Sequence, residues 1–300
     1  MSELPETDSK SKEAALKGLF IAGLLDAIIT SVAFIMANSS VLLADFLKTS
    51  IELLAIFLSW MAMRRINRGD KSFEYGLGKL ENMLSIFVGF VMFVSFVIIM
   101  VNAIRNIFHP GHIAGIGVWI SVGAQSLYLV INGSLYVKNK KLAKSSSSPL
   151  MDSQTRLFLT RFIGNLFILI SLALSLLLKK YSWSVYIDPA ASMIIAFSIL
   201  SAILGIFSSS IYDLLDRTLE EERQILILQE LVGFFDDYQQ VHGIRSRRSG
   251  SKVYIEIFLE FSPEKTVAEV QKVIDKLRGN LEKKIQGSSV TIGLTTEAVK

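Results

Sequence analysis

Apolar stretches of membrane-spanning length recur over roughly the first two thirds of the chain and are separated by short polar connections. About 20 residues at a rise of 1.5 Å per residue are enough for a helix to cross the hydrocarbon core of a bilayer. A small serine run precedes the fifth stretch, and Pro149 suits a first helical turn. The pattern predicts six transmembrane helices, at about residues 17–37, 41–63, 83–107, 113–136, 157–178 and 185–211.

The pattern changes after Asp216. Apolar residues at helical spacing predict helices over 219–235 and 266–285, and alternation of apolar and polar residues predicts strands over 252–261 and 288–294. The stretch 241–252 contains two glycines and is expected to hold a short strand that turns back into the next one. We therefore expect an all-α membrane bundle of six transmembrane helices followed by a small C-terminal α+β domain. The predicted division is a short mobile tail (1–15), a membrane domain (16–212) and a C-terminal domain (213–300).

Composition supports a membrane protein. The chain is 51% hydrophobic and only 19% charged, and its mean hydropathy is +0.47, which makes the lipid bilayer the first partner to consider. It has no cysteine and three histidines, which excludes disulfides, thiolate sites and a His-rich metal site. We find no phosphate-binding loop and no G-x-S-x-G motif. The sequence therefore predicts no enzyme activity, no cofactor and no nucleic-acid partner.

Basic residues cluster in alternate connections. They precede the first stretch and follow the second and fourth, whereas the opposite connections carry few charges. By the positive-inside rule, both termini are expected in the cytoplasm. The polar N-terminus lacks the features of a secretory signal, so we expect it to remain in the mature chain. The host membrane is not indicated.

Charged residues inside the predicted spans are the main candidates for function, because each ionised group near the bilayer centre costs about 2.5–3.5 kcal/mol. Asp45, Lys48 and Glu52 lie at i, i+3 and i+7 of the second span and share one stripe of the helix. In the fifth span Asp152, Arg156 and Thr160 share a face, Arg161 follows them, and the first span adds Asp26. One interpretation is a polar cavity lined by the second and fifth spans. The other is charge pairing that only holds the helices together.

Several segments resemble landmarks of the cation diffusion facilitator family, in matching order and spacing. They are SVLLAD at 40–45, YGLGKLE at 75–81, Asn132, IDPAA at 187–191, DLLDR at 213–217 and VHGIRSRRSG at 241–250. The resemblance extends over residues 16–296. It implies a homodimeric transporter that exports zinc, manganese or iron in exchange for protons. It also implies a ferredoxin-like cytoplasmic domain that dimerises and, in many members, binds regulatory metal. Lys79 and Asp216 match a charge interlock that joins the protomers in that family; ordinary positive-inside charge and a helix-end carboxylate would explain them equally well.

The metal positions depart from the family pattern. The second-helix transport positions hold Lys48 and Glu52, and the fifth-helix positions hold Arg156 and Thr160, or Leu157 and Arg161 if the alignment shifts by one residue. Ammonium and guanidinium groups offer no lone pair to a cation. Glu52 is therefore the principal candidate ligand, and Asp45 is a second one.

The accessory metal positions depart in the same way. The loop after the second span keeps Asp70, where Phe73 and Leu77 replace histidines. The cytoplasmic positions correspond to His242, Phe258, Gln271 and Gly293, so only the histidine remains. A single histidine there is more often structural than metal-binding.

Three hypotheses follow. The first is a cation transporter with a rebuilt site, in which Glu52 and Asp45 bind the ion with help from Asp26 and Thr160. In this hypothesis Lys48 acts as a built-in cation that gives up its proton when the ion enters. The second is a transport-inactive member that serves as a regulatory or hetero-dimerising subunit. The third is a transporter of a non-metal substrate. We favour the first.

Overall fold

The computed structural model describes residues 5–67, 78–146, 149–249 and 252–298. The chain divides into two compact units. The first comprises residues 1–61 and 87–205, and the second comprises residues 62–86 and 206–300.

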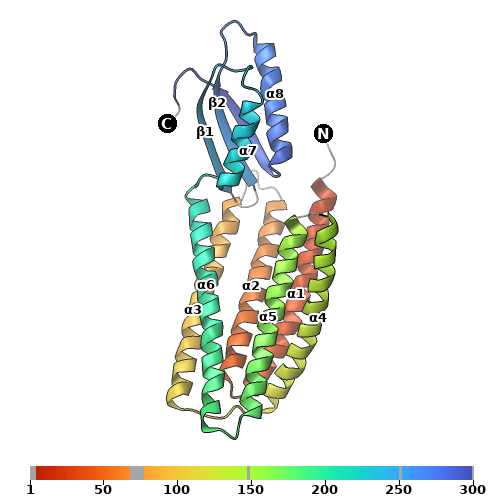
Figure 1. Ribbon diagram of the computed structural model, residues 1–300, viewed down its shortest axis with the longest axis vertical. Helices are drawn as coiled ribbons and strands as arrows, with labels where there is room; N and C mark the ends of the chain where they lie inside the picture. Colours follow the sequence, from red (N-terminus) through yellow and green to blue (C-terminus); the bar gives the residue numbers. More distant parts are fainter. Residues whose placement is uncertain (1–4, 68–77, 147–148, 250–251, 299–300) are drawn as a thin grey trace. The chain divides into compact units, whose positions relative to one another are not determined.

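Long helices build the first unit, where they run side by side (Figure 1). Three of them, α2, α3 and α6, continue into the second unit. The helices are α1 (Pro5–Ile35), α2 (Ser40–Asn67), α3 (Gly78–Phe108), α4 (Ile116–Ser146), α5 (Pro149–Leu177) and α6 (Ile187–Leu214), with a 3-10 turn, η1 (Ser182–Tyr186), before α6.

Four of these helices are long and apolar enough to cross a membrane. Their apolar spans are Lys79–Phe108, Ile116–Lys138, Phe158–Leu177 and Ser182–Leu214. The apolar part of α1, Leu19–Ile35, is shorter, and α2 is not among the four. Helix α2 carries the charged residues Asp45, Lys48 and Glu52, which lower its mean hydropathy.

Two helix limits differ from the prediction. Helix α1 begins at Pro5 and so extends into the stretch expected to be a mobile tail. That stretch contains Lys, Glu and Ala, which are strong helix formers, and proline is favoured at a first helical position. Helix α4 similarly continues to Ser146, past the end of its apolar part. Helix α5 begins at Pro149, as predicted.

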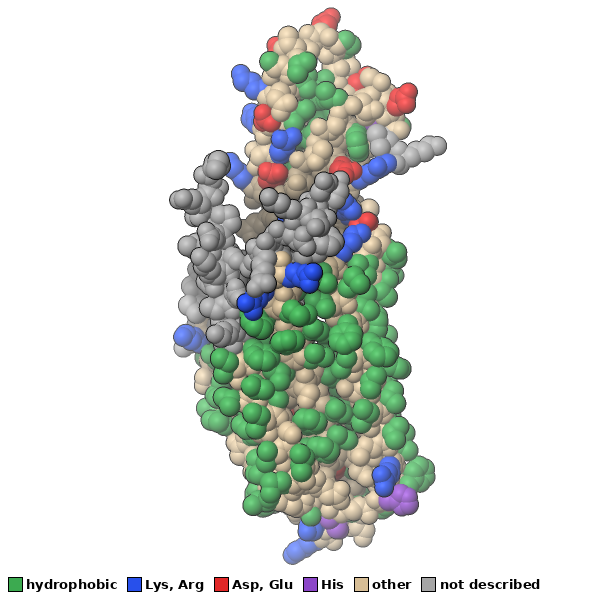
Figure 2. Space-filling model, turned by 180° about the vertical axis from the view of Figure 1, so that it is seen from behind, with side chains coloured by type: hydrophobic (Ala, Val, Ile, Leu, Met, Phe, Trp, Pro, Cys, Tyr) green, Lys and Arg blue, Asp and Glu red, His purple; other side chains and the backbone are tan. Residues whose placement is uncertain are grey.

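Hydrophobic side chains cover the face of the bundle displayed in Figure 2. Helix α3 alone exposes Phe87, Phe90, Phe93, Val97 and Val101 by 41–61%. Apolar area of this extent is typical of contact with lipid or with another protein rather than with water. Helix α4 packs against both α1 and α5.

A buried carboxylate fixes the start of α2. Asp188, at the beginning of α6, is 4% exposed. It accepts hydrogen bonds from Ser39 Oγ (2.5 Å), Ser40 N (2.5 Å) and Val41 N (3.4 Å). The first N–H groups of a helix lack partners within the helix. This carboxylate therefore caps α2 and interacts favourably with the positive end of the helix dipole.

The second unit contains a three-stranded sheet with strand order β1-β2-β3. Strand β1 (Gln240–Ser249) is antiparallel to β2 (Lys252–Glu260), and β3 (Ser288–Leu294) is parallel to β2. Helices α7 (Glu221–Val232) and α8 (Val267–Lys284) pack on the sheet (Figure 1). These elements confirm the predicted helices and strands of the C-terminal region.

One face of β2 forms the core of this domain. Val253, Ile255, Ile257 and Leu259 alternate along the strand and are at most 2% exposed. They pack against α7 and α8, whose buried residues include Ile227, Leu277 and Leu281. The other face of β2 carries Tyr254, Glu256, Phe258 and Glu260, as expected from the period of two of a half-buried strand.

Candidate functional site

The predicted stripe of α2 lies in the first unit, with Asp45 at its best-buried position. Asp45 is only 7% exposed, whereas Lys48 and Glu52 are half-buried. Asp45 and Glu52 are seven residues apart, which is about 10 Å along a helix axis. One ion could not contact both carboxylates unless the backbone moved.

Helix α4 supplies the partner of Asp45. Gln125 Nε2 donates a hydrogen bond to Asp45 Oδ2 over 2.7 Å. Three residues further along α4, Tyr128 interacts through its hydroxyl with the carboxylate of Asp26 on α1. The charges of Asp26 and Asp45 also act on each other. Two carboxylates from different helices therefore face one side of α4.

Helix α5 supplies the partner of Glu52. Arg161 Nη2 lies 3.4 Å from Glu52 Oε2, and the two side chains are 36% and 44% exposed. This ion pair joins α2 to α5. It is the arrangement that the one-residue shift of the sequence alignment would give.

Lys48 also lies against α5. A Cβ atom placed on Gly164 would come within 3.4 Å of Lys48 Nζ. The missing side chain therefore leaves room for the ammonium group beside the α5 backbone. The two basic groups, Lys48 and Arg161, thus both lie between α2 and α5.

The remaining predicted transport positions are less well defined. Thr160 is exposed. Arg156 and Asp152 belong to α5, but their side chains lie outside the described part of the chain. Asp70 also lies outside the described residues.

No ready-made metal site is found where the structure describes the chain. Within those ranges, no three His, Asp or Glu side chains gather closely enough to hold a metal ion. His242 instead has Glu260 as its partner, with Nε2 and Oε2 2.7 Å apart, and its side chain is 7% exposed. The pairing joins β1 to β2.

The other accessory positions of the C-terminal domain take part in packing or hydrogen bonding. Phe258 is paired in register with Gly293 of β3. A Cβ atom at Gly293 would lie 3.0 Å from the Phe258 ring, so the ring rests on the glycine. Gln271, on α8, donates a hydrogen bond to Asp275 of the same helix.

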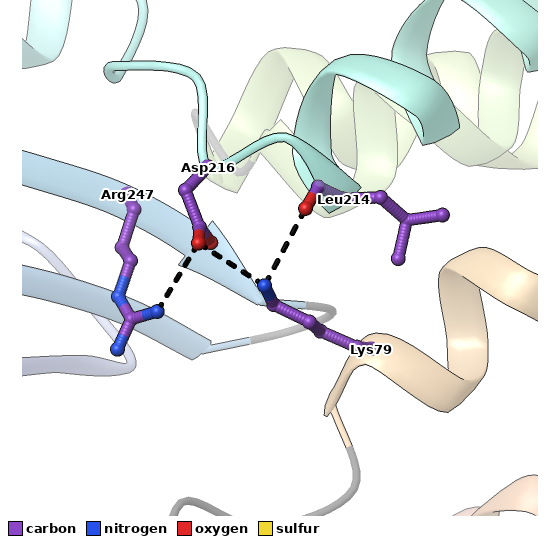
Figure 3. A network of polar contacts seen from close by, with 4 residues as sticks. All are labelled: Lys79, Leu214, Asp216 and Arg247. Atoms are coloured by element: carbon purple, nitrogen blue, oxygen red, sulfur yellow. Dashed lines mark hydrogen bonds and ion pairs between the residues drawn. The ribbon is translucent and has the colours of Figure 1, made fainter.

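Lys79 and Asp216 lie in the second unit and form an ion pair within one chain, as shown in Figure 3. Lys79 Nζ lies 3.1 Å from Asp216 Oδ2 and also donates to the carbonyl of Leu214 over 3.4 Å. Arg247 of β1 adds a second cation, with Nη1 3.4 Å from the same carboxylate oxygen. Asp216 has φ of 54°, a left-handed conformation that aspartate tolerates better than most residues.

Sequence reasoning missed Gln125 and Tyr128 and weighed Arg161 only as an alternative. The signal for Gln125 was an amide inside an apolar stretch, which in a membrane needs a hydrogen-bond partner. Nothing in the sequence shows which helix provides that partner.

Two family models match this chain. A family model described as the cation efflux transmembrane domain matches residues 18–215. A second, described as the cytoplasmic domain of cation efflux proteins, matches residues 219–294. Together they cover nearly the whole chain.

Individual relatives match over most of their length. The cation-efflux pump FieF of Pectobacterium atrosepticum is 22% identical over 84% of this chain and 81% of its own. The uncharacterized transporter YdbO of Bacillus subtilis is 25% identical over 99% of this chain and 100% of its own. A solved structure of the putative zinc transporter CzrB is 24% identical and covers 26% of this chain and 95% of its own, with a TM-score of 0.25, too low to establish a common fold. The two family models carry the assignment: the chain belongs to the cation efflux family and is an integral membrane cation transporter.

Proposed function

We propose that the protein exports a divalent metal ion, such as zinc, manganese or iron, in exchange for protons, through a rebuilt site between α2 and α5. The observation that carries this proposal is the Glu52–Arg161 ion pair between these helices. It lies beside the Lys48 ammonium, which fits against Gly164. Relatives named as cation-efflux pumps, such as FieF of Pectobacterium atrosepticum, support a cation as the cargo.

The chemistry centres on Glu52. Its carboxylate offers lone pairs to a cation, whereas the side chains of Lys48 and Arg161 offer none and repel a dication. An entering metal ion must therefore displace Arg161 from Glu52. Asp45, with Asp26 and Thr160, supplies further oxygen donors along the route, and Lys48 gives up its proton as the ion enters.

We further propose how the whole chain is arranged in the membrane. Helices α1 and α2 complete a set of six membrane spans, and both termini lie in the cytoplasm. The domains are residues 1–15, 16–212 and 213–300, and the last folds in a ferredoxin-like manner. The protein forms a homodimer, in which Lys79 and Asp216 contribute to the contact between protomers.

Metal flux into proteoliposomes under an imposed pH gradient tests the function. We expect saturable uptake of at least one of zinc, manganese and iron by the wild-type protein. Glu52→Gln should abolish it, because the amide keeps the size of the side chain and removes its charge. Lys48→Ala should uncouple metal uptake from proton release, which a pH-sensitive dye inside the vesicles reports.

Glu256→Gln is the matched control. It makes the same change on β2, and we expect normal flux. Normal flux in Glu52→Gln would overturn the assignment of the site. An absence of flux for all three metals, from a wild-type protein shown to be folded and dimeric, would overturn the proposed cargo.

A further inference from the structure

A second group of polar side chains lies beside the proposed transport site, between α1, α2 and α4. It contains Asp26 of α1, Asp45 of α2, and Gln125 and Tyr128 of α4. Asp45 lies two helical turns from Glu52 along α2, so the group offers a second place at which an ion could be held.

Hydrogen-bond acceptors outnumber donors in this group. Gln125 is 2% exposed, and its Nε2 donates to Asp45. The carbonyl oxygen of the same amide, Gln125 Oε1, is buried without a hydrogen-bond partner among the described residues. Asp26 Oδ1 is in the same condition. A buried acceptor without a partner costs about 1–3 kcal/mol, and a bound cation would remove that cost.

The charges around the group indicate the charge of that cation. Asp26 interacts electrostatically with Glu52, Lys48 and Arg161, and Asp45 interacts with Lys48, Glu52 and Asp26. Counted as fully ionised, the three carboxylates carry one negative charge more than the two basic groups balance among the described side chains. A monovalent cation would neutralise it, whereas a dication would leave an excess positive charge inside the membrane, which is costly.

The donor atoms indicate the type of cation. Two carboxylates, an amide carbonyl and a phenol hydroxyl are all oxygen ligands, which suit hard cations rather than soft ones. We infer that Asp26, Asp45 and Gln125 form a binding site for a hard monovalent cation, sodium, distinct from Glu52. Asp26 and Asp45 are also oxygen donors on the proposed transport route, and the inference requires only that they bind sodium when no divalent metal is present.

Thermal unfolding of the full-length protein in detergent, without divalent metal, tests the inference. A ligand that binds the folded state raises Tm in a saturable way. We expect sodium chloride to do so relative to equal concentrations of choline chloride. Asp26→Asn and Asp45→Asn should weaken the apparent sodium affinity at least tenfold. Gln125→Leu should also weaken it, and it replaces either asparagine variant that fails to fold.

Two further variants separate a specific site from general charge effects. Arg161→Gln should strengthen sodium binding, because it removes a nearby positive charge, whereas Glu256→Gln in the C-terminal domain should have no effect. The inference is overturned if folded wild-type protein shows no sodium-specific rise in Tm. It is equally overturned if sodium affinity survives Asp26→Asn and Gln125→Leu, or falls in Arg161→Gln.

Discussion

At the scale of single residues, the same side-chain type serves different purposes according to what surrounds it. Asp188 receives hydrogen bonds from three groups at the start of α2, so its charge is used for structure. Asp45 receives one from Gln125, and Glu52 has Arg161 as its partner. In the proposed mechanism, these last two carboxylates exchange partners when an ion arrives.

The role of Asp188 leads to a stability prediction. Asp188→Ala should lower the free energy of unfolding by about 2 kcal/mol, because it leaves buried N–H and O–H groups without an acceptor. Chemical denaturation of the protein in detergent would measure the loss. Asp236→Ala, which truncates an exposed aspartate, is the control, and an equal effect in the two variants would contradict the capping role.

At the scale of elements, helix α8 shows how local sequence determines where a helix begins. Helix α8 begins with a capping box, in which the Thr266 side chain accepts from Glu269 N and Glu269 Oε2 accepts from Thr266 N. The hydrogen bonds from Thr266 hold the pKa of Glu269 below its ordinary value. The ionised form is thus favoured in the folded state.

The capping box predicts an acid-dependent fraying of α8. The contribution of Glu269 is present above the carboxyl pKa of the unfolded chain and is lost as the pH falls through the lowered pKa of the folded state. Hydrogen exchange at the first turn of α8 should accelerate over that acidic range. Glu269→Ala should remove this pH dependence, and an unchanged profile in that variant would exclude the mechanism.

At the scale of the whole molecule, one carboxylate ties three segments of the second unit together. Asp216 links the first turn of α3, through Lys79, to strand β1, through Arg247. The pair was predicted as a contact that joins protomers. The structure contains it within one chain, and its part in the dimer remains a proposal.

The proposed interlock predicts a weaker dimer when its charge is removed. Asp216→Asn is the cleanest change, since asparagine also tolerates a positive φ. Exposed ion pairs contribute about 0–1 kcal/mol, so we expect the dimer dissociation constant to rise by up to about fivefold. Lys79→Gln should give a similar rise, and light scattering over a dilution series would detect it. A dissociation constant unchanged in both variants would remove these residues from the dimer contact.

The C-terminal fold was the part most readily predicted from sequence. Alternation over 252–261 and 288–294 and helical spacing over 266–285 are strong local signals, and each gave the element that the structure contains. The N-terminal end of α1 was not predicted, because its helix-forming residues lie outside the apolar pattern that was used to place the spans.

The sequence by itself determined that the chain is a membrane protein with a small C-terminal α+β domain, and that Asp45, Lys48 and Glu52 share one helix stripe. Both follow from periodicity along a single segment. Only the tertiary structure decided the partners of these residues: Gln125 for Asp45, Arg161 for Glu52 and the Gly164 backbone for Lys48. The reason is that a partner on another helix depends on helix rotation and depth, which residues far apart in the chain determine together.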